Sequence, residues 1–399
     1  MKLPRIPPSA IPRLQENRRH LAALLPTCKT LNSAQNELRW IHDSLESSTL
    51  APQFQKILTT KGDDKKAKHE LLYRLCRLRG RGYPLQYILG NQPFGDLDIQ
   101  CRPGVLIPRR ETEAWTVHLA QVVREALEEK EKETRKEVDA DLKIIDMCTG
   151  SGCIALLLFS LLNQRFPKMQ VRGYDIEPRA VELARENLEY NKKYSLLHPP
   201  EYRDGVLFGE ANVFSTTWPF HVIREDRCKP AEKNNIQEMT SSAQDNERMV
   251  WNKNTFGVLV CNPPYISEEG FGRDTEHSVR SYEPRLALVP DPSASRKLYP
   301  DVRPEDIFYA KILDDAAMMQ PQFVALEVGD TAQAIRVLQM AFERYKIAGA
   351  EIWRDWPDAI PRDYEEESVE IADVSVPIRG SGNGRAVVLR RRSGLSAEF

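Results

Sequence analysis

Hydrophobic residues recur at helical spacing over the first part of the chain, from about residue 13 to residue 80. The clearest series place apolar side chains three and four positions apart, at Leu38, Ile41 and Leu45 and again at Leu71, Leu72, Leu75 and Leu78. A stripe of this kind is the buried face of an amphipathic helix. The pattern predicts a small helical domain over residues 1–93. Its apolar faces could form only the domain core or could also receive a protein partner, and we favour a core with an exposed side that faces a partner.

The pattern then changes to alternation of apolar and polar positions over residues 94–107. Leu97 and Ile99 lie on one side of the segment Cys101-Arg102-Pro103-Gly104, and an apolar run from Val105 to Ile107 lies on the other. Alternation around a Pro-Gly turn is typical of a β-hairpin. We therefore expect a hairpin over 94–107 that links the helical domain to the rest of the chain.

Residues 108–399 contain short apolar runs that alternate with segments of helical periodicity. The expected strands cover 143–147, 171–174, 256–261, 323–328 and 349–353, and the expected helices cover 154–162, 180–188, 307–318 and 332–345. Alternation of strand and helix predicts an α/β domain with a mainly parallel sheet covered on both faces. Two stretches rich in charged, polar or proline residues, 223–247 and 290–304, interrupt the pattern and are predicted to be mobile surface insertions.

Composition narrows the class of protein. The chain has 399 residues, is 41% hydrophobic and carries a formal charge of −2, so it lacks the basic excess of a dedicated nucleic-acid binder. Its seven cysteines form no C-x-x-C pair, which favours reduced thiols over a disulfide framework or a metal site. No apolar run reaches the roughly 20 residues of a membrane span. We expect a soluble, intracellular protein without a membrane partner.

The amino-terminal residues are basic. The first fifteen contain Lys2, Arg5 and Arg13 and no acid, as mitochondrial transit peptides do. Prolines at positions 4, 7, 8 and 12 disfavour the amphipathic helix of such a peptide. Composition alone leaves a transit peptide and a frayed basic terminus as equal alternatives.

A glycine-rich turn, Asp146-Met147-Cys148-Thr149-Gly150-Ser151-Gly152, joins an expected strand to an expected helix. Glycines at 150 and 152 allow a ligand to approach the backbone, and the helix N-terminus offers unpaired N–H groups. The spacing matches neither the phosphate-binding loop nor G-x-G-x-x-G, which disfavours nucleoside triphosphates and dinucleotides. The turn predicts a site for a different small-molecule cofactor.

Asp175 follows the next expected strand and can accept hydrogen bonds from both hydroxyls of a ribose. An aspartate between strand and helix is also a common helix N-cap. Because the glycine turn precedes it at a suitable distance, ribose binding is the favoured interpretation.

The segment Asn262-Pro263-Pro264-Tyr265 follows the buried strand expected over 256–261. The Asn262 side-chain oxygen and the Pro263 carbonyl can accept both hydrogens of a planar NH2 group, which aligns its nitrogen with a methyl donor. Pro264 stiffens the loop, and Tyr265 can stack on the planar group. In isolation the segment could be a plain turn. After a cofactor loop, it predicts methylation of an amide or a nucleobase nitrogen.

Several further segments resemble the HemK-type protein (glutamine-N5) methyltransferases. They are Pro84 to Gly90, Phe94-Gly95, Val105 to Glu113, Tyr282 to Leu288, Glu327-Val328-Gly329 and Gly384 to Val387. The glycine turn, Asp175 and the Asn262 segment match the motifs of that family in order. The resemblance covers most of the chain from about residue 80 onward, and Glu37 to Ile41 is similar to fungal mitochondrial members.

The resemblance implies a Rossmann-like, class I fold that uses S-adenosylmethionine as cofactor. It implies N5-methylation of the glutamine in the Gly-Gly-Gln motif of a peptide-chain release factor, with the helical domain docking that factor. Asn262 and Pro263 would be catalytic and would bind the substrate together with Pro264 and Tyr265. The implied cofactor residues are Asp146, Cys148, Thr149, Gly150, Ser151, Gly152, Asp175, Asn212, Val213 and Asn262, and no metal is implied.

Three positions depart from the family pattern. Cys148 stands where the family usually has glycine, and Arg110 stands where it has proline. Asn212 occupies the position at which an acid usually meets the adenine amino group, although an amide oxygen still accepts that hydrogen bond.

Two other functions stay open. An amino-methyltransferase of adenine or cytosine in nucleic acid uses the same Asn-Pro-Pro-Tyr chemistry on a flipped base. A non-catalytic scaffold of a translation complex could keep the fold without the reaction. The favoured interpretation is a monomeric release-factor methyltransferase of the mitochondrial matrix, with the cytoplasm as the alternative, and with no direct nucleic-acid substrate.

Overall fold

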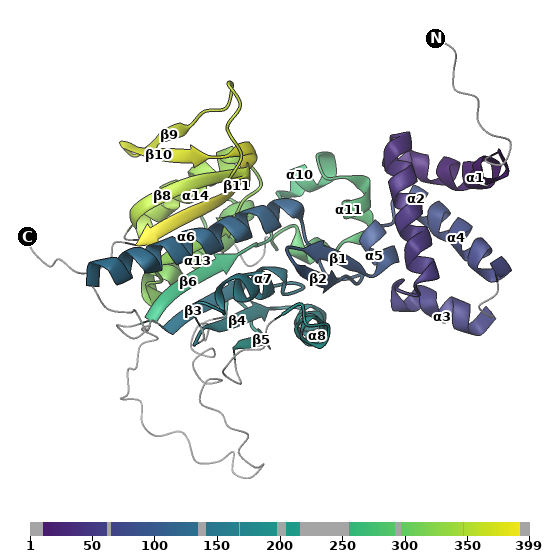
Figure 1. The fold of residues 1–399 in the computed structure, drawn as a ribbon. Coiled ribbons are helices and arrows are strands. Elements are labelled where there is room, and N and C mark those ends of the chain that lie inside the picture. Colours follow the sequence, from purple (N-terminus) through teal and green to yellow (C-terminus); the bar gives the residue numbers. More distant parts are fainter. Residues whose placement is uncertain are drawn as a thin grey trace, which may run out of the picture. The chain divides into compact units, whose positions relative to one another are not determined.

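The structure is a computed structural model that describes residues 11–61, 65–134, 141–166, 168–197, 205–215, 255–291, 297–345 and 347–391 (Figure 1). Its contacts divide the chain into two compact units. Unit 1 comprises Met1–Pro93, Asp98–Ile107 and Gly272–Arg285, and unit 2 comprises Phe94–Leu97, Pro108–Phe271 and Leu286–Phe399. The predicted insertion 223–247 lies outside the described residues. Residues 292–296 of the predicted insertion 290–304 also lie outside the described residues, and in its described remainder the Tyr299 hydroxyl donates to Asp314 at 2.7 Å.

Unit 1 is helical in its amino-terminal part. Its helices are α1 (Ile11–Cys28), α2 (Leu31–Glu46), α3 (Pro52–Lys61), α4 (Lys65–Gly80) and α5 (Leu85–Leu89). The apolar stripe of α2 is buried at Ala34, Leu38, Ile41 and Leu45, as amphipathic spacing requires. Thr30 caps this helix by accepting a hydrogen bond from the Ser33 amide. At Gly80 a Cβ would lie 1.8 Å from the Ala23 carbonyl oxygen, so the packing of α1 against α4 requires glycine there.

A later part of the chain completes unit 1. It contains α11 (His277–Tyr282), where the Ser278 hydroxyl donates to the Gly82 carbonyl at 2.6 Å. The Tyr282 ring packs edge-on against Tyr83, with 5.1 Å between the ring centroids. The segment that directly follows the Asn262–Tyr265 loop and α10 (Glu268–Arg273) therefore folds with the amino-terminal helices.

The hairpin lies earlier than the predicted 94–107. Its strands are β1 (Asn91–Phe94) and β2 (Leu97–Gln100), and the turn between them contains Gly95 at φ +58°. The sequence pattern places the turn at residues 101–104, and this prediction is wrong. Backbone groups of Val105 and Ile107, which would pair in a second strand, form hydrogen bonds with side chains instead. The Val105 carbonyl accepts from the Tyr87 hydroxyl at 2.8 Å, and the Ile107 amide donates to Glu283 at 3.1 Å. These bonds replace a strand ladder over residues 105–107.

Unit 2 is built on a nine-stranded sheet with the order β5-β4-β3-β6-β7-β11-β8-β10-β9. The strands are β3 (Asp141–Met147), β4 (Gln170–Asp175), β5 (Val206–Glu210), β6 (Thr255–Cys261), β7 (Phe323–Glu327), β8 (Ile347–Trp356), β9 (Ser368–Ile371), β10 (Val374–Arg379) and β11 (Ser381–Arg391). The first five in this order pair in parallel, whereas β11 is antiparallel to both neighbours. The expected mainly parallel sheet is confirmed.

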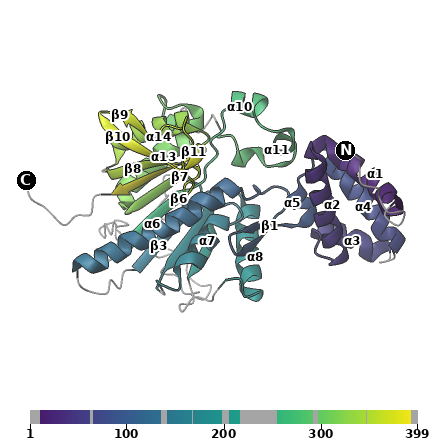
Figure 2. The same ribbon diagram turned by 45° about the horizontal axis from the view of Figure 1, so that its top comes forward.

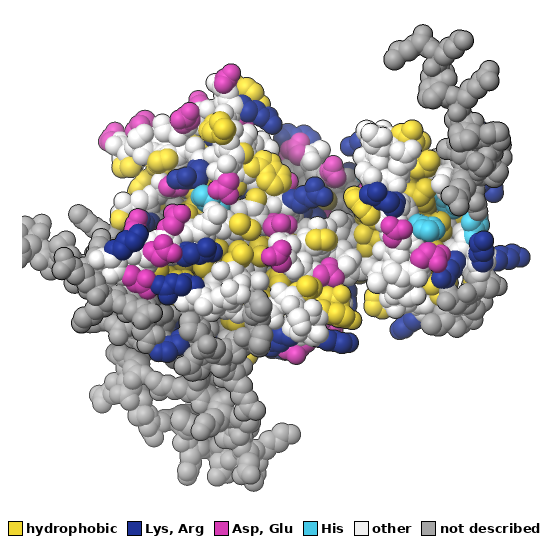
Figure 3. Space-filling model, viewed as in Figure 1, with side chains coloured by type: hydrophobic (Ala, Val, Ile, Leu, Met, Phe, Trp, Pro, Cys, Tyr) yellow, Lys and Arg dark blue, Asp and Glu magenta, His cyan; other side chains and the backbone are white. Residues whose placement is uncertain are grey.

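Helices cover both faces of this sheet, as predicted from the alternating pattern. They are α6 (Arg110–Thr134), α7 (Cys153–Leu162), α8 (Pro178–Lys193), α13 (Ile307–Met319) and α14 (Thr331–Arg344), with short 3-10 turns at Arg285–Ala287 and Pro304–Asp306. Figure 2 shows α6 and α7 over one face and α13 and α14 behind the other. Acidic and basic side chains mix along the outer side of α6 (Figure 3), as expected of a solvated face. No helix in the described part of the chain is long and apolar enough to cross a membrane.

Candidate functional site

The predicted site residues follow four neighbouring strands of unit 2. Because β5, β4, β3 and β6 are adjacent and parallel, the loops after their carboxyl ends meet at one edge of the sheet. The register pairs Met147 with both Tyr174 and Cys261, and it pairs Asp175 with Glu210. The sheet thus brings together the glycine turn, Asp175, the Asn212 loop and the Asn262 loop.

Asp146 organises the glycine turn from inside the protein. Its side chain is fully buried, and Oδ2 accepts hydrogen bonds from the Thr149 hydroxyl at 2.6 Å and from the Ala155 amide at 3.3 Å. Burial raises the pKa of this carboxyl group from 3.8 to about 7, against the lowering effect of those two hydrogen bonds. Oδ1 is buried without a hydrogen-bond partner in the described part of the protein. Asp146 therefore fixes the shape of the turn on which a ligand would rest.

Three residues of the turn have left-handed backbone conformations, namely Cys148 at φ +58°, Gly150 at φ +55° and Gly152 at φ +81°. A Cβ at Gly152 would lie 2.9 Å from Phe208, so packing requires glycine there. A Cβ at Gly150 would meet nothing within 4 Å, which leaves open space above this residue. Gly150 is thus the glycine at which a ligand can approach. Cys148 has a side chain at a positive φ that glycine adopts without strain.

Asp175 links the glycine turn to the end of β4. Its Oδ2 accepts from the Gly150 amide at 2.9 Å, and its Oδ1 accepts from the Glu177 amide at 3.0 Å. Glu177 is the N-cap of α8, so the simple N-cap interpretation of Asp175 does not hold. Burial raises the pKa of Asp175, and the backbone hydrogen bonds oppose that rise. The carboxylate is held by two amides beside the open space at Gly150.

The Asn212 loop begins at the end of β5, where the Ala211 amide donates to the Asp175 carbonyl at 2.9 Å. The exposed Asn212 side chain accepts from the Phe214 amide at 2.9 Å, which leaves one lone pair of its oxygen for a ligand. Val213 is buried in the core between the sheet and α13. Asn212 is therefore the polar group and Val213 the apolar anchor of this loop.

The Asn262 loop leaves β6 with Pro263 and Pro264 buried and Asn262 half-buried. Tyr265 is fixed at two points, because its hydroxyl donates to Glu327 at 3.3 Å and its carbonyl accepts from Gln333 at 3.2 Å. Burial and the charge of Glu327 raise the pKa of the Tyr265 phenol, which keeps it protonated as a donor. Two side chains from other elements therefore hold the loop at Tyr265.

Sequence reasoning did not identify the residues that support this loop. The sequence marks Glu327 only as part of a segment that resembles the family, and it does not mark Gln333 or Trp115. A signal existed for Glu327, which is a carboxylate at the end of an otherwise apolar strand next to β6.

The residues at the turn fit S-adenosylmethionine. Open space lies over Gly150, and the Asp175 carboxylate stands beside it, while the buried Asp146 fixes the shape of the turn. Residues 146–152 contain no lysine or arginine, which suits a cationic sulfonium with ribose hydroxyls and does not suit a phosphate.

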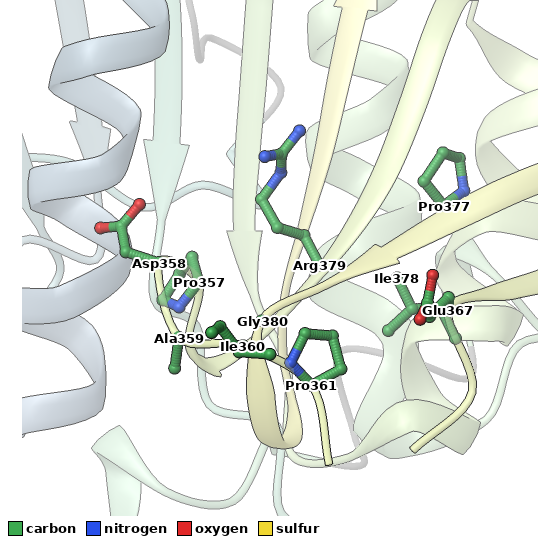
Figure 4. A pocket seen from close by; sticks show the side chains of 10 residues that line it. All are labelled: Pro357, Asp358, Ala359, Ile360, Pro361, Glu367, Pro377, Ile378, Arg379 and Gly380. Carbon is green, nitrogen blue, oxygen red and sulfur yellow. The ribbon is translucent and has the colours of Figure 1, made fainter. Parts of the chain in front are cut away.

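A cavity of about 480 Å³ lies elsewhere in unit 2, lined by residues 357–361, Glu367 and residues 377–380 (Figure 4). It adjoins β8 and β10, which β7 and β11 separate from β6 in the sheet. Two of its charged groups already have partners, since Asp358 binds His118 at 2.7 Å and Arg379 binds Glu351 at 3.0 Å. We assign this cavity no part in the candidate site.

The sheet order, the glycine turn after β3 and the acid at the end of β4 define a class I S-adenosylmethionine-dependent methyltransferase. No protein-family profile matches the chain. Among solved structures, the METTL16 MTase domain is 12% identical over 75% of this chain and 75% of that one, with a TM-score of 0.38.

Curated relatives give the family. The chain is 36% identical to the probable MRF1 mitochondrial N(5)-glutamine methyltransferase mtq1 of Schizosaccharomyces pombe, over 72% of this chain and 74% of the relative. It is 31% identical to the mitochondrial MRF1 N(5)-glutamine methyltransferase MTQ1 of Saccharomyces cerevisiae, over 72% of this chain and 68% of that relative. It is 27% identical to the release factor glutamine methyltransferase of Bacillus subtilis, over 80% and 86%. The chain belongs to the N(5)-glutamine methyltransferase family.

Proposed function

We propose that the protein transfers the methyl group of S-adenosylmethionine to the side-chain nitrogen of the glutamine in the Gly-Gly-Gln motif of a release factor. One observation supports this most strongly. The loop Asn262–Tyr265 follows β6 and is held at Tyr265 by Glu327 and Gln333, and the Gly150 turn follows the neighbouring parallel strand β3. Groups of the Asn262 loop that can bind a planar NH2 group thus adjoin a candidate cofactor site, in a chain of the glutamine methyltransferase family.

The acceptor nitrogen needs orientation because its lone pair is delocalised into the amide. The Asn262 side-chain oxygen and the Pro263 carbonyl accept its two hydrogens, which aims the nitrogen at the methyl group. Transfer would break the sulfur–carbon bond of the donor and form a nitrogen–carbon bond, so that the donor leaves as a neutral thioether and the nitrogen releases one proton to water. Pro264 limits the motion of the loop, and the Tyr265 ring packs against the planar amide. No strong general base is required.

The cofactor supplies the electrophilic methyl group when it is bound. Asp175 would accept hydrogen bonds from the ribose hydroxyls, while the Gly150 amide holds that carboxylate in place. Asn212 would accept from the adenine amino group with the lone pair that Phe214 leaves unused, and Val213 anchors the loop. Asp146, Cys148, Thr149, Ser151 and Gly152 shape the turn on which the cofactor rests.

Membership of this family also supports a proposal for the partner and the location. Unit 1 docks the release factor, and the chain connection supports this role because residues 272–285, just after the acceptor loop, fold into unit 1. The two fungal relatives carry "mitochondrial" in their names, which supports action in the mitochondrial matrix. We propose that the enzyme acts as a monomer.

The test incubates the full-length protein with methyl-labelled S-adenosylmethionine and one of three acceptors. These are a mitochondrial release factor, its variant with alanine in place of the glutamine of the Gly-Gly-Gln motif, and total nucleic acid. We expect label only in the unaltered release factor. Equal label in both release factors, or label confined to nucleic acid, would show that the acceptor has been misidentified.

A further inference from the structure

A buried carboxylate stands behind the acceptor loop. Glu327 ends β7, and its side chain is buried. Its Oε2 accepts from the Thr112 hydroxyl at 2.6 Å and from the Trp115 indole N–H at 2.8 Å, while Oε1 accepts from the Tyr265 hydroxyl at 3.3 Å. The indole nitrogen can only donate, so Glu327 is an acceptor in this cluster. The three donors come from two places, the start of α6 and the Asn262 loop.

The Tyr265 side chain has little freedom in this arrangement. Its backbone carbonyl accepts from the Gln333 side chain, whose own oxygen accepts from the Gly329 amide at 2.8 Å. A Cβ at Gly329 would lie 3.3 Å from the Tyr265 ring, so glycine allows the ring to lie against the backbone. The bond to Glu327 then fixes the far end of the ring. Backbone, ring and hydroxyl of Tyr265 are each held by a different residue.

A buried acid is a costly way to fill space, because desolvation opposes its charge. The same burial raises the pKa of Glu327, and the hydrogen bonds from Thr112 and Trp115 oppose that rise. Arg385 lowers the cost as a nearby positive charge, although its guanidinium pairs with Asp355 at 2.8 Å. An apolar residue at position 327 would fill the same space without this cost. The presence of a carboxylate at position 327 is explained if the function of the protein requires the Tyr265 hydroxyl to be held in one position.

We propose that Glu327 is a positioning residue for methyl transfer, which holds the Tyr265 ring against the acceptor amide and ties that ring to Thr112 and Trp115 at the start of α6. This inference rests on the proposed function. Glu327 acts through Tyr265 and has no direct part in the chemistry. It also gives a role to the segment around Thr112, which otherwise serves only as a family signature.

The experiment is a double-mutant cycle with Glu327→Gln and Tyr265→Phe, each of which nearly preserves shape. We expect each variant to lower kcat about tenfold and to leave KM for S-adenosylmethionine within about twofold. The kcat of the double variant should be no lower than that of the less active single variant, because both changes break the same hydrogen bond between Tyr265 and Glu327. Thr112→Val should lower kcat in the same direction, and it replaces Glu327→Gln if that variant fails to fold.

Tyr309→Phe is the matched control. The Tyr309 hydroxyl is also buried and donates to Glu327, but to the backbone carbonyl, at 2.7 Å. A merely structural cluster predicts equal losses of kcat for Tyr309→Phe and Tyr265→Phe, whereas positioning predicts a loss only for the latter. Additive effects in the cycle, or unchanged kcat in folded Glu327→Gln, would overturn the proposal.

The two proposals fail in different ways. A wild-type protein that leaves the release factor unlabelled contradicts the proposed function. The same double-mutant cycle, measured in urea denaturation, then tests the link between Glu327 and Tyr265 without an acceptor. Additive losses in unfolding free energy would show that the two side chains are not coupled and would overturn the inference on its own.

Discussion

Replacement of Asp146 by asparagine should remove a pH dependence from the stability of unit 2. The carboxyl group is fully buried, and its pKa in the folded protein is raised to about 7 from 3.8. A raised pKa means that the folded state binds the proton more tightly than the unfolded state. Its contribution to stability is therefore complete below pH 3.8 and is lost as the pH rises toward 7.

The magnitude follows from the size of the shift. Each pH unit between the two pKa values changes the free energy of unfolding by about 1.4 kcal/mol. Between about pH 5 and about pH 8, the free energy of unfolding changes only over the roughly two pH units below the folded pKa of about 7, so the total change is about 3 kcal/mol. The asparagine of the variant cannot ionise, and its oxygen can still accept from Thr149 and from the Ala155 amide. The wild type should therefore lose about 3 kcal/mol relative to Asp146→Asn over this range.

The assay is urea denaturation at pH 5, 6, 7 and 8, followed by the fluorescence of Trp115 and Trp353, which are buried in unit 2. The exposed position Asp363 provides the control Asp363→Asn for the loss of one carboxylate. A difference between wild type and Asp146→Asn that stays constant with pH would refute the reasoning. So would a wild type that gains stability relative to the variant as the pH rises.

Three further outcomes are expected. Asn262→Ala should lower kcat because the transition state loses on the order of 3 kcal/mol of stabilisation. Cofactor binding, measured by calorimetry, should stay nearly intact. A loss of cofactor binding would show that Asn262 has a different role in the mechanism. Gly152→Ala should destabilise unit 2 by about 1–3 kcal/mol in denaturation through its clash with Phe208 and its positive φ. Gly150→Ala has the strain of a positive φ without a clash, so it should destabilise unit 2 less than Gly152→Ala does and should weaken cofactor binding. Asp175→Ala should weaken cofactor binding at least tenfold with the acceptor KM unchanged, and equal loss for both ligands would contradict its ribose role.

The sequence predicts those parts of the fold in which local pattern and tertiary burial agree. Strands β3, β4, β6 and β7 are apolar runs in a covered parallel sheet, so their composition alone marks them. The sequence pattern does not predict strand β5, because Leu207 and Glu210 are exposed at the edge of the sheet. Strands β9 and β10 form a hairpin at the other edge with several exposed residues, and their pattern is correspondingly weak.

The candidate site, like the fold, has parts that the sequence predicts and parts that it does not. The Gly150 turn and the Asn262 loop are contiguous in sequence, and their chemistry can be inferred from neighbouring residues. The support of Tyr265 cannot, because Thr112 and Glu327 are 215 positions apart and meet only in the folded protein. The hairpin was misplaced for a similar reason, since Glu283 takes the Ile107 amide from 176 positions away.

The central claim is that the methyl group goes to one glutamine nitrogen of a release factor. The most direct measurement is fragment mass spectrometry of a release factor incubated with S-adenosylmethionine and the wild-type protein, with Asn262→Ala as the matched control. The account predicts one added methyl group on the side-chain nitrogen of the glutamine in the Gly-Gly-Gln motif, and little or none with the variant. A methyl group on another residue, or equal methylation by both proteins, would contradict it.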